Sequence, residues 1–213
     1  MYMKLLMKKA TKYYWFLILI AGILYSTPSR AQNDDASQVD TTLTDNQMAA
    51  FSQQAKDDVI DFAGHVKHIA DKNISTYLRK KYINNALALF SDPDVNIVEV
   101  SSLKDPSVIV RPSIKEYLFR LMNLPYTKVN ITWYNFKISG FQKGKDGNYY
   151  ATAMIFQKFS ATVGNTEIHK QVNNWVKKSI QISLVKKQSY NGVKPADYWD
   201  VKLGDIHVQE ATL

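Results

Sequence analysis

The chain has 213 residues, no cysteine and a formal net charge of +8. The lack of cysteine excludes disulfides, thiolate nucleophiles, cysteine metal sites and the lipid-modified cysteine of bacterial lipoproteins. Five of the 27 basic residues and none of the 19 acidic residues lie in the first 31 positions, so the rest of the chain carries a net charge of about +3. This near balance, without a basic stripe interleaved with exposed aromatics, argues against a nucleic-acid partner.

The first 31 residues have the layout of a secretory signal peptide. Lysines precede an apolar run of 11 residues, 15–25, and Pro28, Ser29 and Ala31 follow it. A membrane-spanning helix needs about 20 apolar residues, so this run is too short for a permanent span. We expect cleavage after Ala31 and a secreted or periplasmic protein that meets the membrane only through the transient signal peptide. The alternative is an inner-membrane N-terminal anchor.

The remaining chain divides into a short leader and one domain. Residues 32–43 are polar and acidic without periodicity, which indicates a flexible leader. Residues 44–213 contain no linker or internal repeat and suit a single domain.

The first half of the domain predicts three helices. A capping-box pattern at Thr44 opens a helix whose apolar residues recur at three- and four-residue steps as far as Ile69. A second helix is expected over residues 75–90, and a third begins at Ser113 and ends before Pro125.

The second half predicts long antiparallel strands. Apolar residues alternate from Val129, and the phase slips near Tyr134, which indicates a β-bulge. Further strands are expected over 149–159, around 180–184 and over 198–208, with a second bulge at Gly204. Helices followed by such strands predict an α+β fold, in which the N-terminal helices pack on one face of a strongly bent antiparallel sheet.

The element order, with the segments "PSIKEYLFRLMNL", "RKKYINNALALF" and "YWDVKLGDIHV", resembles the nuclear transport factor 2-like (cystatin-like) superfamily, and above all its uncharacterised secreted bacterial members. The resemblance covers residues 44–213 and implies a cone-shaped fold. Enzymes of similar shape, the ketosteroid isomerase-like and polyketide cyclase-like groups, work with an ionisable group inside the cone. No family motif assigns chemistry to a residue of this chain.

The strand phase predicts an inner face without proton-exchanging groups. The expected inward residues are Val129, Ile131, Trp133, Phe136, Ile138, Ile180, Ile182, Leu184, Val201 and Leu203. The pairs Lys177-Lys178 and Lys186-Lys187 and the run at residues 79–81 are interpreted as solvated edges. We therefore predict no catalytic residue, and the acid-and-phenol combination to test is Asp205 with Tyr134 or Tyr150.

The sequence offers one candidate metal site and one candidate ligand or partner surface. Asp61, His65 and His68 share a helix flank at metal-ligand spacing, but that flank is expected to face water, so neither a metal nor another cofactor is predicted. Trp175 breaks the alternation around it, which makes it the candidate for a ligand mouth or partner surface.

The sequence thus favours a secreted, non-catalytic binding or assembly module. Its partner would be an envelope protein or a small apolar ligand. Two alternatives stay open: a small cone-pocket enzyme of lyase or isomerase type, and a homodimeric envelope subunit that pairs through the polar strip of Lys177, Ser179, Gln181 and Ser183.

Overall fold

The computed structural model describes residues 42–101, 108–163, 170–190 and 195–212. The expected signal peptide, and all but the last two residues of the expected leader, lie outside the described residues. Residues Thr42–Leu213 form one compact unit. Within the described ranges, no helix combines the length and apolar character needed to cross a membrane.

The three predicted helices are present, and each begins within one residue of its predicted start. They are α1 (Asp45–Ala70), α2 (Thr76–Leu87) and α3 (Ile114–Met122). The hydroxyls of Thr44, Ser75 and Ser113 each accept a hydrogen bond from the backbone N–H three residues later. These bonds satisfy N–H groups that the first helical turn leaves without a partner.

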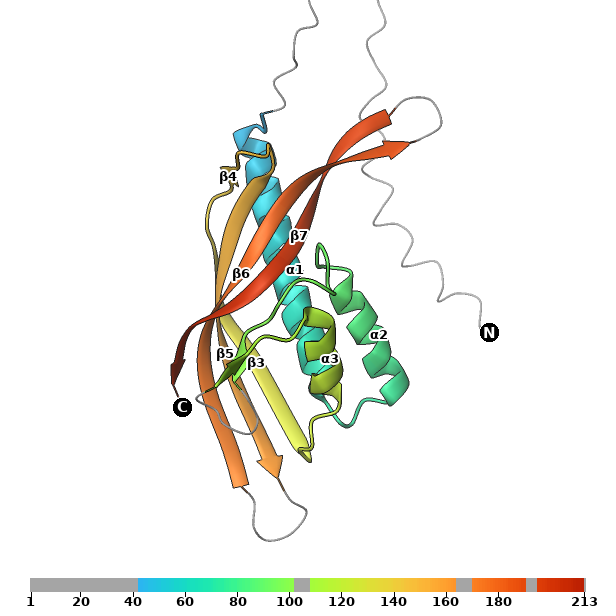
Figure 1. The fold of residues 1–213 in the computed structure, drawn as a ribbon, viewed down its shortest axis with the longest axis vertical. Helices are drawn as coiled ribbons and strands as arrows, with labels where there is room; N and C mark the ends of the chain where they lie inside the picture. The colour runs from blue at the N-terminus through green and yellow to red at the C-terminus, as the bar shows by residue number, and fades with distance from the viewer. Residues whose placement is uncertain (1–41, 102–107, 164–169, 191–194, 213) are drawn as a thin grey trace, which may run out of the picture. The chain divides into compact units, whose positions relative to one another are not determined.

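The main sheet is antiparallel and has the strand order β3 (Lys128–Ile138), β5 (Tyr149–Val163), β6 (Lys170–Tyr190) and β7 (Pro195–Thr212). The short β4 (Gln142–Lys143) pairs with β5, while β1 (Val100–Ser101) and β2 (Ile109–Val110) pair with each other. The long strands twist and bend, and the helices lie together against them (Figure 1). The α+β fold with helices on a strongly bent antiparallel sheet is therefore confirmed. We call the sheet face toward the helices the inner face and the other the outer face.

Both predicted bulges are present. The register of β3 against β5 shifts between Tyr134 and Lys137, where Asn135 adopts a φ of 57°, a left-handed conformation that asparagine tolerates. The register of β7 shifts opposite Gln181 of β6. Gly204 lies close to β6 there, since an added Cβ would stand 3.3 Å from the Gln181 Cβ and Gln181 would have to shift to admit it. A bulge adds twist, and the two bulges keep the apolar side chains of the curved strands on the inner face.

The inner face carries the hydrophobic core. Of the residues predicted to point inward, seven are buried: Val129, Ile131, Ile180, Ile182, Leu184, Val201 and Leu203. The other three, Trp133, Phe136 and Ile138, are partly buried and pack against the core. Phe62 of α1 links the layers, since its ring meets those of Phe90 at 5.0 Å and Trp133 at 5.4 Å, both edge-to-face.

The segment after α2, which we call the covering segment, covers the part of the free edge of β7 at Leu203 and Ile206. Phe90 and Leu203 form a parallel bridge, and the Glu99 N–H donates to the Ile206 carbonyl at 2.8 Å. Because Phe90 joins this pairing, α2 ends at Leu87 and not at residue 90 as the sequence predicted. The covered edge cannot recruit a foreign strand.

Arg79 corrects one expectation from the charge pattern. It was expected on a solvated edge, yet only 6% of it is exposed. Its guanidinium donates to the carbonyl of Ile69 at the end of α1 and to that of Met122 at the end of α3. Burial lowers the pKa of Arg79. One guanidinium group thus provides hydrogen bonds to carbonyls at two helix C-termini. No local sequence pattern reveals this arrangement.

Replacing Ile182, which is 1% exposed, by Asp should unfold the domain. An unpaired carboxylate in the core costs several kcal/mol, against a total stability of about 5 to 15 kcal/mol for a domain of this kind. The neighbour Gln181 is exposed on the outer face, so Gln181→Asp is the matched control and should change stability by no more than about 1 kcal/mol. Urea denaturation followed by circular dichroism measures both, and a fully folded Ile182→Asp protein would contradict the strand phase.

Candidate functional site

A pocket with aromatic walls lies on the outer face, near the end of the sheet formed by β3, β5 and β6. The register places one residue from each long strand in a single row across this face: Tyr134, Phe156, Lys177 and Glu210. Trp175 stands in the next row, opposite Lys158 of β5. Side chains on one face of a sheet contact their cross-strand neighbours, so the row sets these groups side by side.

The rings of this pocket have defined angles. Tyr134 stacks on Phe156 with centroids 5.6 Å apart and planes inclined by 21°. Trp175 meets Tyr134 edge-to-face at 5.5 Å and 81°. The pocket has a volume of about 310 Å³ and is lined by Tyr134, Phe156, Trp175, Val176, Lys177 and Glu210. We call it the aromatic pocket.

Charged groups surround the aromatic walls. Lys177 and Glu210 form an ion pair at 3.3 Å, in which the Lys177 side chain is 30% exposed and the Glu210 side chain 74% exposed. The Lys158 ammonium lies 4.9 Å from the centre of the Trp175 ring, within cation–π range. The aromatic pocket therefore offers flat apolar surface with two cations and one carboxylate at its margin.

Two residues singled out in the sequence, Tyr134 and Trp175, meet in this pocket, although they were singled out for different roles. The sequence interpretation placed Phe156 within the strand expected over 149–159 but assigned no role to it. Its outward phase was the available signal: Met154 and Phe156 alternate with Ile155, which is fully buried.

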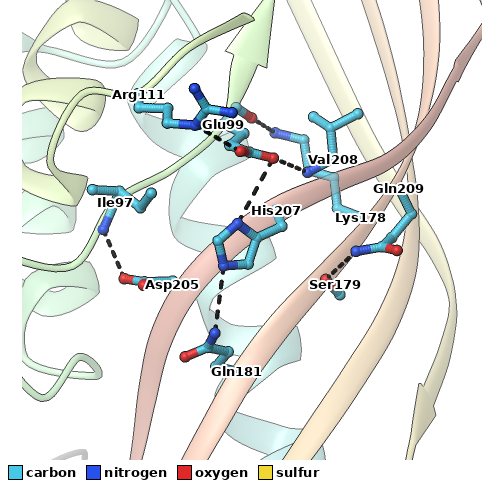
Figure 2. A network of polar contacts seen from close by, with 10 residues as sticks. All are labelled: Ile97, Glu99, Arg111, Lys178, Ser179, Gln181, Asp205, His207, Val208 and Gln209. Atoms are coloured by element: carbon cyan, nitrogen blue, oxygen red, sulfur yellow. Dashed lines mark hydrogen bonds and ion pairs between the residues drawn. The ribbon is translucent and has the colours of Figure 1, made fainter.

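Asp205 is not brought together with either tyrosine. Its carboxylate accepts hydrogen bonds from the Ile97 N–H at 2.9 Å and from the Asn96 side chain at 3.3 Å, which fixes the bulge to the covering segment (Figure 2). The Tyr150 hydroxyl instead donates to Asp146 at 2.5 Å, within the β4–β5 turn. The structure thus places the three residues in separate local networks.

His65 and His68 of the helix-flank group pack against Tyr82 of α2 and are partly buried, so they do not face water as the sequence predicted, whereas Asp61 is exposed. The His68 ring stacks on Tyr82 with centroids 4.6 Å apart, and the His65 ring lies 5.7 Å from the same tyrosine. Burial lowers the pKa of His65, an effect that Asp61 partly opposes. Among the described residues, no three His, Asp or Glu side chains converge as metal ligands would.

A polar network joins the covering segment to β7 near the C-terminal end of that strand (Figure 2). The Glu99 carboxylate accepts hydrogen bonds from Arg111 Nε at 2.8 Å and from the Val208 N–H at 2.9 Å, and lies 3.7 Å from His207 Nδ1. Burial alone would raise the pKa of Glu99, but these donors together lower it below its ordinary value. Glu99 therefore stays ionised and holds an otherwise unpaired edge N–H.

Lys178 contradicts the prediction of an inner face without proton-exchanging groups. It was interpreted as part of a solvated pair, but it is 3% exposed, and its ammonium donates to the Glu99 carbonyl at 3.0 Å. Burial lowers its pKa from 10.5 to about 8, partly opposed by Glu99. The sequence carried the signal, because Lys178 has the same phase as Ile180 and Ile182.

Polar atoms also stand beside Lys178 on the inner face. Gln157 is 7% exposed and follows the inward phase of β5, and its strand partner on β3 is Trp133. Gln157 Oε1 and Trp133 Nε1 are both buried, and neither has a hydrogen-bond partner within the described residues. This part of the inner face is polar, unlike the hydrocarbon surface expected from the sequence.

Replacing Lys178 by Met should change how stability depends on pH. Between pH 8 and about 10.5 the unfolded chain holds this proton more tightly than the folded protein, so the Lys178 contribution to the free energy of unfolding rises with pH in that window, by up to about 3 kcal/mol. Lys178→Met should remove this rise, because methionine carries no group that titrates. Lys177→Met, on the outer face, is the matched control and should keep the rise. Equal pH profiles for wild type and Lys178→Met in urea denaturation would show that Lys178 is not buried as a cation.

Comparisons with known proteins find only distant structural likeness. No family model and no curated protein matches the chain. It is similar to a solved candidate scytalone dehydratase from Novosphingobium aromaticivorans, with a TM-score of 0.42 and 10% identity over 78% of this chain and 90% of that one. It is also similar to a solved protein from Kribbella flavida, with a TM-score of 0.42 and 10% identity over 76% of this chain and 95% of that one. Likeness at this level carries no argument about the activity of the chain.

Proposed function

We propose that this protein is a non-catalytic binding module of the bacterial envelope or exterior, which binds a ligand in the aromatic pocket of its outer sheet face. The observation that carries the proposal is the assembly of Tyr134, Phe156 and Trp175 around one pocket on the sheet face opposite the three described helices. Its volume lies at the lower end of the range of about 300 to 1,000 Å³ that small-molecule sites occupy.

Exposed aromatic surface supports this interpretation. Trp175 is 44% exposed, although its ring would gain free energy by burial. Clustered apolar side chains on an open surface are a feature of binding sites. Tryptophan and tyrosine are also the side chains that most often dominate binding energy, because they combine large contact area with few rotatable bonds.

The enzyme alternative would depend on Lys178, the buried group with a lowered pKa on the inner face. A lysine nucleophile has to reach its substrate, whereas the Lys178 ammonium is buried and bonded to the Glu99 carbonyl. These contacts favour a structural role, in which Lys178 fastens the covering segment to the sheet.

Binding in the aromatic pocket is tested with naphthylmethanol and naphthoate in an NMR titration that follows the backbone amide signals of β3, β5 and β6. Trp175→Ala and Tyr134→Ala should each weaken binding by about tenfold, which corresponds to about 1.4 kcal/mol. Tyr77→Ala removes a ring that is 78% exposed on α2, and this control should leave binding unchanged. Binding that is insensitive to both pocket substitutions, or no binding of either probe at millimolar concentration, would reject the proposed function.

The proposed location depends on the N-terminal segment. A secreted or periplasmic protein should be recovered with Gln32 as its first residue, since the motif predicts cleavage after Ala31. N-terminal sequencing of protein from the native host measures this directly. Recovery of the uncleaved chain with the membrane fraction would support the inner-membrane anchor instead.

A homodimer is the second candidate function, because the aromatic pocket and the strip Lys177, Ser179, Gln181 and Ser183 share one face. Exposed aromatic surface on an open sheet is also what a two-fold partner would cover. A dimer through this face should sediment as a single species of twice the mass at low micromolar concentration, and Trp175→Glu should dissociate it. Strictly monomeric sedimentation of the wild type would remove this candidate.

A further inference from the structure

We propose that the aromatic pocket selects a planar aromatic ring that carries an anionic group, such as an aromatic carboxylate. This inference rests on the proposed function and names the class of its ligand.

The pocket walls favour a flat ring. Trp175 contacts Tyr134 edge-to-face and nearly perpendicular, so the two rings form a corner in which a ligand ring can stack on one wall while its edge meets the other. Offset-stacked and edge-to-face contacts are the two favourable aromatic geometries. A volume of about 310 Å³ accommodates one or two fused rings and little more.

The charges at the margin favour an anion. Among the described residues, Lys158 and Lys177 flank the rings and Glu210 is the single acid in the pocket lining, so these three side chains together carry one net positive charge. Lys137 adds a further cation in the neighbouring row, where it pairs with Met154. A cationic ligand would meet repulsion from these ammonium groups, and the Trp175 ring already has Lys158 over it.

The ion pair beside the rings shows how an anion would be held. Glu210 lies mostly in solvent, with 74% of its side chain exposed, whereas Lys177 is held closer to the sheet at 30%. An exposed ion pair contributes little free energy, so a ligand carboxylate can replace Glu210 on the Lys177 ammonium at small cost. The ring would then lie against Tyr134 and Trp175 while its carboxylate faces Lys177.

Three probes with the same ring separate charge from shape: naphthoate, naphthylmethanol and naphthyltrimethylammonium. In NMR titrations of the full folded domain, naphthoate should bind about fivefold tighter than naphthylmethanol at low salt, and the cationic probe should bind weakest. The advantage of naphthoate should shrink as salt is added. Tighter binding of the cationic probe, or equal binding of the anionic and neutral probes, would overturn the inference while leaving the proposed function intact.

Charge variants locate the selectivity. Lys177→Gln should reduce the preference for naphthoate over naphthylmethanol to about twofold or less, whereas Glu210→Gln should increase it, because the competing carboxylate is gone. Lys80→Gln removes an exposed lysine on α2 and is the matched control, with no expected change in preference. An unchanged preference in Lys177→Gln would show that the anion is not held by this lysine and would overturn the inference. Failure of all three probes to bind wild type would instead reject the proposed function.

Discussion

The two-residue alternation of the long strands is the constraint on which the rest of the structure depends. Successive side chains of a strand point to opposite faces, so strands that bury Ile155 and Ile180 against the helices necessarily present Phe156 and Ser179 on the other side. The bulges preserve this assignment where β3 and β7 bend. All three helices lie on the inner face, and the outer face is left for side chains that do not build the core. The aromatic pocket is a consequence of that division.

Local patterns predicted the parts of the fold that depend on local physics. The helix starts at Thr44 and Ser113, the bulges and the inward set of apolar residues follow from spacing and phase, and all are confirmed. Arg79 and Lys178 could not be assigned in the same way, because a charged residue is buried only when a partner elsewhere in the fold accepts its hydrogen bonds. Those partners are carbonyls of Ile69, Met122 and Glu99, which only the folded chain brings near.

The aromatic pocket was predictable only in part for a related reason. Trp175 was a candidate because it broke its strand pattern, and Tyr134 was a candidate as the phenol to test with Asp205, so each was singled out for a different reason. Their meeting depends on the register of three strands, and a shift of one residue in any pairing would separate them.

The polar residues of the inner face could, in contrast, have been predicted from the alternation within single strands. The alternation along β5 and β6 already placed Gln157 and Lys178 on the inner face, but that face was expected to be hydrocarbon throughout.

The central claim is that three rings form one solvent-accessible pocket on the outer face of the free protein. Nuclear Overhauser contacts between assigned side-chain protons, recorded with and without a soluble paramagnetic probe, test it most directly. The structure requires contacts from the Tyr134 ring to both Phe156 and Trp175, together with strong relaxation of the Trp175 signals by the probe. Absent ring contacts, or a Trp175 ring shielded from the probe, would contradict the account.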